Sequence, residues 1–286
     1  MKNSFPVFYF SGTGNTWWAA LRIAEALQKK GFQSQAFSIE QITPEAASEM
    51  IRNSQGAGFG FPVYGSDAPR VFSAWLGRLP VQAEAKPTLG FVTQMAWSGS
   101  GFNYLEKPMK AKGLYLRWTV ELNMPNNICL PAFPIFPYRS DTEKFKKLLG
   151  KRESDIEALA GQIAAGIPRR QHNDLFSRAS AWIQRGPFRL VHDMGRGLWS
   201  VDGGRCLGES CGRCARICPV GNIQMSAGKA AHGKACVYCL RCFNYCPTYA
   251  IRYLGASNQK MEKKPPFRGP VPEFRPELVC QEDRGS

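Results

Sequence analysis

Apolar residues in the first half of the chain follow two alternating patterns. Short apolar runs predict buried strands, and stretches with apolar residues three and four positions apart predict amphipathic helices. The predicted strands are 7–10, 33–39, 56–61, 88–95 and 114–122. The predicted helices are 17–27, 44–51, 69–79, 102–112 and 141–167. This alternation predicts a doubly wound α/β fold, in which helices cover both faces of a parallel five-stranded sheet.

The pattern changes after this unit, and a length of 286 residues already favours more than one domain. We expect the α/β domain to span 1–168. Residues 169–203 have no clean period but hold large apolar side chains, so they predict a packed linker. Residues 204–254 form a separate cysteine-rich unit. Residues 255–286 contain five prolines and few core-forming residues, which predicts an extended tail or strap.

Cysteine is concentrated in one short part of the chain. Eight of the ten cysteines lie between Cys206 and Cys246. No signal-peptide pattern follows Met1 and no apolar run approaches the roughly 20 residues of a membrane span, so we expect a cytoplasmic, thiol-reducing setting. In such a setting this density indicates a metal site or catalysis and not a disulfide framework.

The cysteines form an internal repeat. Three of them recur 28 positions later: Cys211, Cys214 and Cys218 correspond to Cys239, Cys242 and Cys246. Cys206 and Cys236 are 30 positions apart, so the first copy has a C-x₄-C spacing where the second has C-x₂-C. Each copy ends in Cys-Pro.

This repeat resembles the bacterial ferredoxins that hold two [4Fe-4S] clusters, in which the cysteine of Cys-Pro binds the other cluster. The resemblance implies a small α+β ferredoxin domain with crossed ligand sets. One set is Cys236, Cys239, Cys242 and Cys218, and the other is Cys206, Cys211, Cys214 and Cys246. The wider spacing after Cys206 departs from the usual pattern. Two zinc sites are the alternative, although zinc ribbons do not require three cysteines at one turn followed by Cys-Pro.

A second motif lies between the first predicted strand and helix. Glycines and hydroxyl side chains alternate in this loop, which comprises Ser11, Gly12, Thr13, Gly14, Asn15 and Thr16. Backbone N–H groups, hydroxyls and a helix start are the donors that a phosphate group needs. The loop lacks the lysine of a Walker motif and does not match G-x-G-x-x-G. The alternative is an ordinary turn rich in small polar residues.

This loop resembles the FMN-phosphate loop of flavodoxins, and the whole chain resembles bacterial flavodoxin–ferredoxin fusion proteins. The resemblance covers about 5–125 by loop pattern and 204–254 by cysteine pattern. It implies a flavodoxin-like fold that binds FMN at the carboxyl ends of the strands. A second flavin loop would comprise Pro62, Val63, Tyr64 and Gly65, and a third would include Thr93, Gln94, Trp97, Ser98 and Gly99. Tyr64 and Trp97 could instead be core or interface aromatics.

The chain is basic, with 37 Lys and Arg against 22 Asp and Glu and a net charge of +15. The basic residues are scattered and no recognition motif accompanies them, which disfavours nucleic acid. We therefore expect an acidic redox partner protein. No catalytic triad or carboxylate pair stands out.

The leading hypothesis is an electron-transfer iron–sulfur flavoprotein that passes electrons between two [4Fe-4S] clusters and FMN. The first alternative is an FMN-dependent reductase of a small organic substrate, with residues 93–101 and 123–138 as a lid. The second, a redox sensor, has no output domain to support it.

Overall fold

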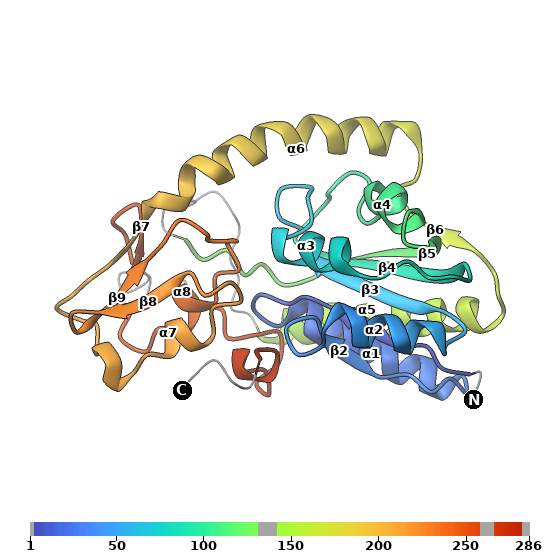
Figure 1. Cartoon of the computed structure of the whole chain (residues 1–286), viewed down its shortest axis with the longest axis horizontal. Coiled ribbons are helices and arrows are strands. Elements are labelled where there is room, and N and C mark those ends of the chain that lie inside the picture. The colour runs from blue at the N-terminus through green and yellow to red at the C-terminus, as the bar shows by residue number, and fades with distance from the viewer. Residues whose placement is uncertain (1–2, 131–141, 258–265, 282–286) are drawn as a thin grey trace.

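The structure is a computed structural model that describes residues 3–130, 142–257 and 266–281 (Figure 1). A large sheet with its helices lies at one end of the molecule, and the cysteine-rich part lies at the other. The helix α6 (Leu175–Gly195) runs along one side of both parts.

The sheet has six parallel strands in the order β2-β1-β3-β4-β5-β6. They are β1 (Val7–Tyr9), β2 (Ala36–Ser38), β3 (Ala57–Pro62), β4 (Lys86–Gln94), β5 (Leu114–Asn123) and β6 (Arg169–Arg170). The order 2-1-3-4-5 is that of a flavodoxin-like fold. The five predicted strands are present, and the fold is the predicted one.

The predicted strand count omits β6, a two-residue strand at the start of the segment interpreted as a linker. Trp118 and Thr119 of β5 pair with Arg169 and Arg170. Two residues are too few to show a hydrophobic period in the sequence. The strand forms because the edge of β5 offers unpaired backbone N–H and C=O groups.

Helices cover both faces of the sheet. On one face, α1 (Asn15–Lys29) and α5 (Thr142–Ala164) pack against Val7, Leu89 and Phe91. The other face is covered by α2 (Pro44–Arg52), α3 (Arg70–Arg78) and α4 (Glu106–Lys110), the last preceded by the 3₁₀ turn η1 (Asn103–Leu105). Adjacent residues such as Val7 and Phe8 belong to different cores because side chains alternate along a strand.

The helix α6 occupies most of the predicted linker. Asp174 caps it by accepting a hydrogen bond from the N–H of Ser177, at 2.9 Å. Its apolar residues lie on two sides: Ala181 is buried, whereas Trp182 is 76% exposed. A helix with apolar residues on opposite sides has no single apolar stripe, which explains why its sequence period was not clear.

The cysteine-rich part consists of short elements. The strand β7 (Trp199–Val201) follows the 3₁₀ turn η2 (Arg196–Leu198) and pairs with β10 (Ile251–Tyr253). The hairpin β8 (Ile223–Ser226) and β9 (Lys229–His232) lies between two short helices, α7 (Arg213–Arg216) and α8 (Arg241–Tyr245). Both helices begin after a left-handed residue, Gly212 and Leu240 respectively, so the sequence repeat is also a structural repeat.

Residues 266–281 form a strap that contacts both parts and contains the 3₁₀ turn η5 (Pro276–Leu278). Phe274 lies 5.2 Å from the ring of Trp17 in α1 and 6.3 Å from that of Tyr245 in α8. Ser38 donates to the carbonyl of Val279, at 2.7 Å. Within the described ranges, no helix has both the length and the apolar character needed to cross a membrane.

Two glycine substitutions test the packing of the sheet. A Cβ at Gly60 in β3 would lie 2.1 Å from the ring of Phe91, so Gly60→Ala should lower the free energy of unfolding by about 1–3 kcal/mol. Gly150 in α5 has no atom within 4 Å of such a Cβ, so Gly150→Ala should stabilise the protein by up to about 1 kcal/mol. Denaturant unfolding measures both. Equal effects of the two changes would contradict this packing.

Candidate functional site

The carboxyl ends of the sheet strands open into a cavity of about 460 Å³, here called the strand-end cavity. Its residues from the sheet loops are Ser11, Gly12, Thr13, Asn15, Thr16, Pro62, Val63, Tyr64, Gly65, Thr93, Gln94, Met95, Pro125, Asn126, Asn127, Ile128 and Leu130. Pro187, Phe188, Tyr238, Leu240 and Tyr253 complete the lining. Eleven of the fifteen residues predicted to bind a flavin therefore lie around one cavity.

The loop from Ser11 to Thr16 is held by hydrogen bonds to its neighbours. The Ser11 hydroxyl accepts from the N–H of Gly14 at 3.2 Å, and the hydroxyls of Thr16 and Thr93 lie 2.7 Å apart. Asn127 donates to the Thr13 hydroxyl at 2.7 Å. The loop leads directly into α1, whose N-terminus adds a positive field. Because the hydroxyls of Ser11 and Thr13 accept these bonds, their O–H groups remain available to donate, and the loop fits a phosphate group.

Gly14 belongs to the loop but is not among the residues that line the cavity. It has a φ of 106°, and a Cβ at this position would lie 2.7 Å from the ring of Phe274 in the strap. Gly14 is therefore required by the backbone turn and by the close approach of the strap.

Tyr64 forms a wall of the cavity. Its hydroxyl is buried and has no hydrogen-bond partner among the described residues. Burial raises the pKa of Tyr64, with the nearby Cys239 adding to the effect, so the phenol stays neutral. The ring is thus an apolar surface of the kind on which a planar aromatic group can stack.

The third predicted loop divides into two parts. Thr93 and Gln94 line the cavity, whereas Trp97, Ser98 and Gly99 are not among its lining residues. Trp97 stacks instead on Phe176 of α6, with ring centroids 6.0 Å apart. A Cβ at Gly99 would lie 2.6 Å from that of Ala181. This loop packs against α6, a helix that the sequence pattern did not predict.

Several lining residues were not predicted from the sequence. Asn126, Asn127 and Ile128 follow β5, in the segment interpreted as a lid, whose residues 131–138 lie outside the described ones. The order of a flavodoxin-like sheet places this loop at the cavity, so its position after the last predicted strand was a usable signal. Phe188 and Tyr238 come from other units and had no such signal.

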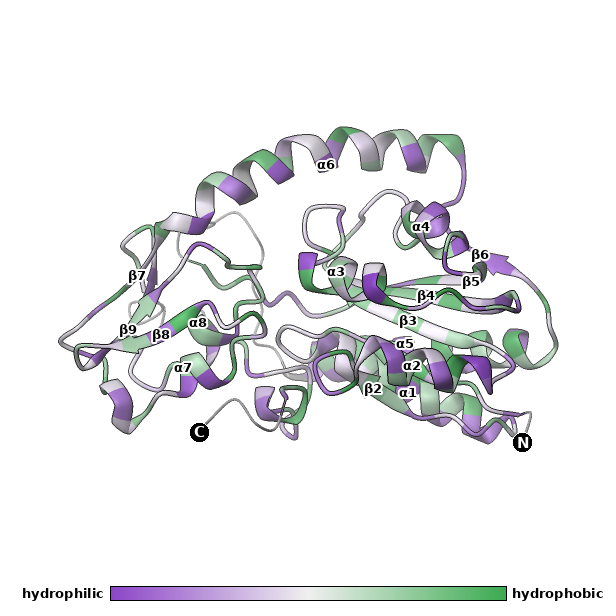
Figure 2. Cartoon of the chain, in the orientation of Figure 1, coloured by the Kyte–Doolittle hydropathy of each residue, from purple (hydrophilic) through white to green (hydrophobic). Residues whose placement is uncertain are grey.

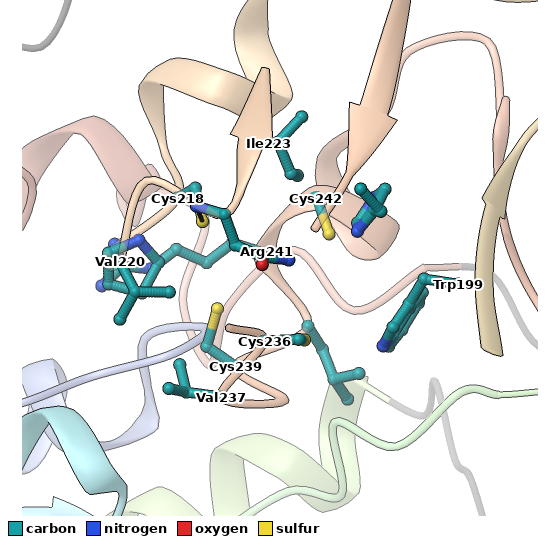
Figure 3. Close-up of a pocket in the computed structure, with 13 residues that line it drawn as sticks. Trp199, Cys218, Val220, Ile223, Cys236, Val237, Cys239, Arg241 and Cys242 are labelled. Atoms are coloured by element: carbon teal, nitrogen blue, oxygen red, sulfur yellow. Dashed lines mark hydrogen bonds between the residues drawn. The ribbon is translucent and has the colours of Figure 1, made fainter. Parts of the chain in front are cut away.

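A second cavity lies in the cysteine-rich part (Figure 3), here called the cysteine cavity. Four predicted ligands line it: Cys218, Cys236, Cys239 and Cys242. Burial raises the pKa of the Cys236 thiol to about 11. Burial also raises the pKa of Cys239, and the negative charges of the Cys218 and Cys236 thiolates raise it further. Four thiolates this close together need a bound cation to compensate their charge.

The other four cysteines form a second group. Burial raises the pKa of the Cys214 thiol to about 11, and the thiolates of Cys246, Cys206 and Cys211 act in the same direction. The cysteines that act on Cys214 are thus the other members of one predicted ligand set, although Cys214 itself also acts on Cys242 of the other set. The wider spacing after Cys206 is taken up by the 3₁₀ turn η3 (Gly208–Ser210), and Cys206 still accepts a hydrogen bond from the N–H of Ala230.

Backbone N–H groups point at the sulfurs in a repeated arrangement. Asn222 donates to Cys218 and Ala250 donates to Cys246, both at 3.2 Å. Each donor lies four residues after its cysteine, so the repeat extends to the hydrogen bonds. Such bonds stabilise negative charge on sulfur.

In the described part of the chain, no group of three or more His, Cys, Asp or Glu side chains could hold a single metal ion. A cubane places a different requirement on its ligands, because each thiolate binds a different iron and the sulfurs surround the cluster. The absence of a mononuclear site among the described residues therefore does not conflict with the predicted cluster ligands.

Arg241 connects the two cavities and was not predicted. It follows Leu240 in the turn between Cys239 and Cys242 and is fully buried. Its guanidinium donates to the carbonyls of Gly12 at 2.9 Å and Ser11 at 2.5 Å. It also forms a bidentate ion pair with Glu40, at 2.5 and 3.0 Å. Burial by itself would lower the pKa of Arg241, but Glu40 outweighs this and raises it, so Arg241 is charged.

The two cavities share a wall. Leu240 lines both of them. A Cβ at Gly12 would lie 2.7 Å from the carbonyl oxygen of Cys239, so the backbones of the two loops touch. Groups bound in the two cavities would be neighbours.

Comparisons with known proteins give matches to parts of the chain. No protein-family model matches it. Putative diflavin flavoprotein A 3 of Synechocystis sp. is 31% identical over 107 residues, which are 37% of this chain and 18% of that protein. The chain thus spans about a fifth of the length of the diflavin flavoproteins that it matches. A solved flavodoxin from the domain Archaea has 14% identity and a TM-score of 0.40, covering 57% of this chain and 98% of that one.

A shorter relative is a ferredoxin. A ferredoxin of Methanothermococcus thermolithotrophicus is 32% identical over 54 residues, which are 18% of this chain and 90% of the ferredoxin. The match therefore extends over nearly the whole of that protein.

The Arg241–Glu40 pair can be tested by unfolding. Arg241→Met would leave Glu40, whose side chain is 2% exposed, buried without its cation, and should cost about 3–5 kcal/mol. The double variant Arg241→Met with Glu40→Leu should be more stable than Arg241→Met alone, because no buried charge remains. Lys29→Met removes the exposed pair with Glu157 and serves as the control, with an unchanged melting temperature expected. A double variant no more stable than the single one would contradict this account.

Proposed function

Over a stretch of 54 residues the chain belongs to the ferredoxin family, and we propose that the protein is an electron-transfer iron–sulfur flavoprotein. It passes electrons between two [4Fe-4S] clusters and FMN. FMN exchanges one or two electrons whereas each cluster exchanges one, so together they convert single electrons into pairs.

The strand-end cavity supports the flavin part of this proposal. Ser11, Thr13 and Thr16 would hold the FMN phosphate at the N-terminus of α1, and the ring of Tyr64 would face the isoalloxazine. The Oδ1 atom of Asn15 is buried and has no partner among the described residues, so it is an acceptor for a ribityl hydroxyl. The diflavin flavoprotein relative agrees with this reading.

The two cysteine groups support the cluster part. Cys218, Cys236, Cys239 and Cys242 would bind the cluster nearer the flavin, and Cys206, Cys211, Cys214 and Cys246 would bind the other. Donors such as the N–H groups of Asn222 and Ala250 would stabilise the thiolates.

The observation that carries the proposal is the wall that the two cavities share. Leu240 would lie between FMN and the nearer cluster, and Arg241 would hold the flavin loop and the cysteine loop at a fixed separation. The net charge of +15 supports an acidic redox protein as the exchange partner.

Cofactor content tests the proposal directly. Protein purified without oxygen should contain about eight iron atoms and about one FMN per chain. Cys242→Ser should lose the cluster nearer the flavin, about half of the iron, because its group of four would be incomplete. Iron, sulfide, zinc and flavin analyses measure these contents.

Cys129→Ser is the matched control for Cys242→Ser. Cys129 is also buried, and its thiol donates to the side chain of Asn244 at 2.9 Å, outside both groups of four. This variant should keep all of its iron. Stoichiometric zinc, or full iron in Cys242→Ser, would contradict the assignment.

A reductase of a small organic substrate is the second candidate function. Ile128, Phe188 and Tyr253 extend the cavity wall beyond the residues that match flavodoxin loops, and such a wall can cover a substrate.

Reoxidation of the fully reduced protein separates these two functions. A carrier should be reoxidised rapidly by an oxidised acidic ferredoxin, and more slowly as salt is added, because screening weakens the attraction. Stopped-flow absorbance measures the rate. Faster reoxidation by enones or nitroarenes than by the ferredoxin would favour the reductase.

A further inference from the structure

The outer side of α6 carries an unusual row of exposed apolar residues. Six large side chains on this helix are between 64% and 84% exposed: Leu175, Phe176, Trp182, Ile183, Leu190 and Met194. They recur at helical spacing and so share one side of a helix about 30 Å long. Figure 2 shows α6 at the edge of the molecule, with several of its turns hydrophobic. We call this row the α6 stripe.

The opposite side of α6 is anchored, which fixes the direction in which the stripe faces. A Cβ at Gly65 would lie 1.8 Å from the ring of Phe188, so this phenylalanine sits directly on the Gly65 backbone. Gln184 accepts a hydrogen bond from Ser66 at 2.7 Å, and Arg185 donates to the Ser66 carbonyl at 3.0 Å. Rotation of the helix would break these contacts. The stripe is therefore a stable feature of the surface.

Positive charge accompanies the stripe. Arg178 and Arg189 lie four residues before and seven after Trp182, on the same side of the helix, and their side chains are 51% and 60% exposed. Arg178 pairs with Glu106 at 3.1 Å and Arg189 pairs with Asp67 at 2.5 Å. Glu106 also pairs with Arg170 and Asp67 with Arg185, so arginine remains in excess over carboxylate on this surface. Within the sequence of α6 there are three arginines and a single acidic residue, Asp193, which pairs with Arg70 and Arg196. The neighbouring α3 contains two arginines and no acid, and α4 contains two lysines and one glutamate.

We propose that α6 docks the protein on an anionic lipid surface. An amphipathic helix with Trp, Phe and Leu on one side and arginine beside them is the form that lies in a membrane interface. The stripe is a row of protruding side chains, which a deformable lipid layer can accommodate without a matching groove. A second copy fits less well, because each copy carries a net charge of +15 and the copies would repel one another. This inference does not depend on the bound cofactors.

Vesicle flotation of the full chain tests the proposal. At low salt, vesicles of phosphatidylglycerol and phosphatidylcholine in equal parts should carry the protein about tenfold more efficiently than vesicles of phosphatidylcholine alone. Trp182→Ser combined with Leu190→Ser should reduce binding to the anionic vesicles by about tenfold or more, because two large apolar side chains no longer insert.

Val81→Ser is the matched control. Val81 is also an exposed apolar residue, at 66%, but it lies between α3 and β4. This variant should bind like the unaltered protein. Failure of anionic vesicles to carry the protein, or undiminished binding of the double variant, would overturn the proposal. A concentration-dependent dimer that Trp182→Ser dissociates would instead assign the stripe to a second copy.

Discussion

A single buried ion pair fixes the flavodoxin-like part against the cysteine-rich part. Arg241 begins α8, and its guanidinium reaches Glu40 just after β2 and the carbonyls of Ser11 and Gly12 just after β1. These carbonyls lie just beyond the first strand, where the backbone has left the sheet and needs new hydrogen-bond partners. The Arg241 side chain thus supplies hydrogen-bond donors to the carbonyls that begin the loop from Ser11 to Thr16, and it also positions the turn between Cys239 and Cys242. A buried pair of this kind contributes little net stability, but it specifies one arrangement of the two parts.

This constraint matters because the cysteine-rich part has little apolar core of its own. One of its buried clusters consists of Cys218, Ile223 and Ala230. The other contains five of its residues, Trp199, Leu240, Phe243, Ile251 and Tyr253, and is completed by Cys129 and Leu130 from outside this part. So small a core cannot offset the conformational entropy of about fifty ordered residues. Contacts from outside, namely Arg241, the strap and the Gly12–Cys239 backbone contact, supply part of what is missing. Metal binding would supply the rest, as in other small domains that fold around their metals.

Features set by nearby residues were predictable from the sequence, and features set by contacts between units were not. The strands, the loop from Ser11 to Thr16 and the cysteine repeat each depend on residues close together in the chain. The positions of the five loop residues other than Gly14, and those of Tyr64 and Gln94, could be predicted because these residues follow the ends of strands. Trp97 was a reasonable flavin candidate by position, but α6 covers its loop and Phe176 takes its ring face. Arg241 could not be recognised, because nothing in a C-x-x-C turn indicates that the residue between the cysteines will meet Glu40.

The orientation of α6 determines how the two parts, and the proposed electron path between them, would lie relative to a lipid surface. The helix runs beside both parts, from the β6 edge of the sheet toward β7 in the cysteine-rich part (Figure 1). A helix lying in a membrane interface would therefore place the line between the two parts parallel to the lipid surface. All four cysteines of the outer set are partly exposed, whereas two of the inner set, Cys218 and Cys239, are buried. The proposed outer cluster, and not the one beside Leu240, is then the centre that a partner at the same surface can approach most closely.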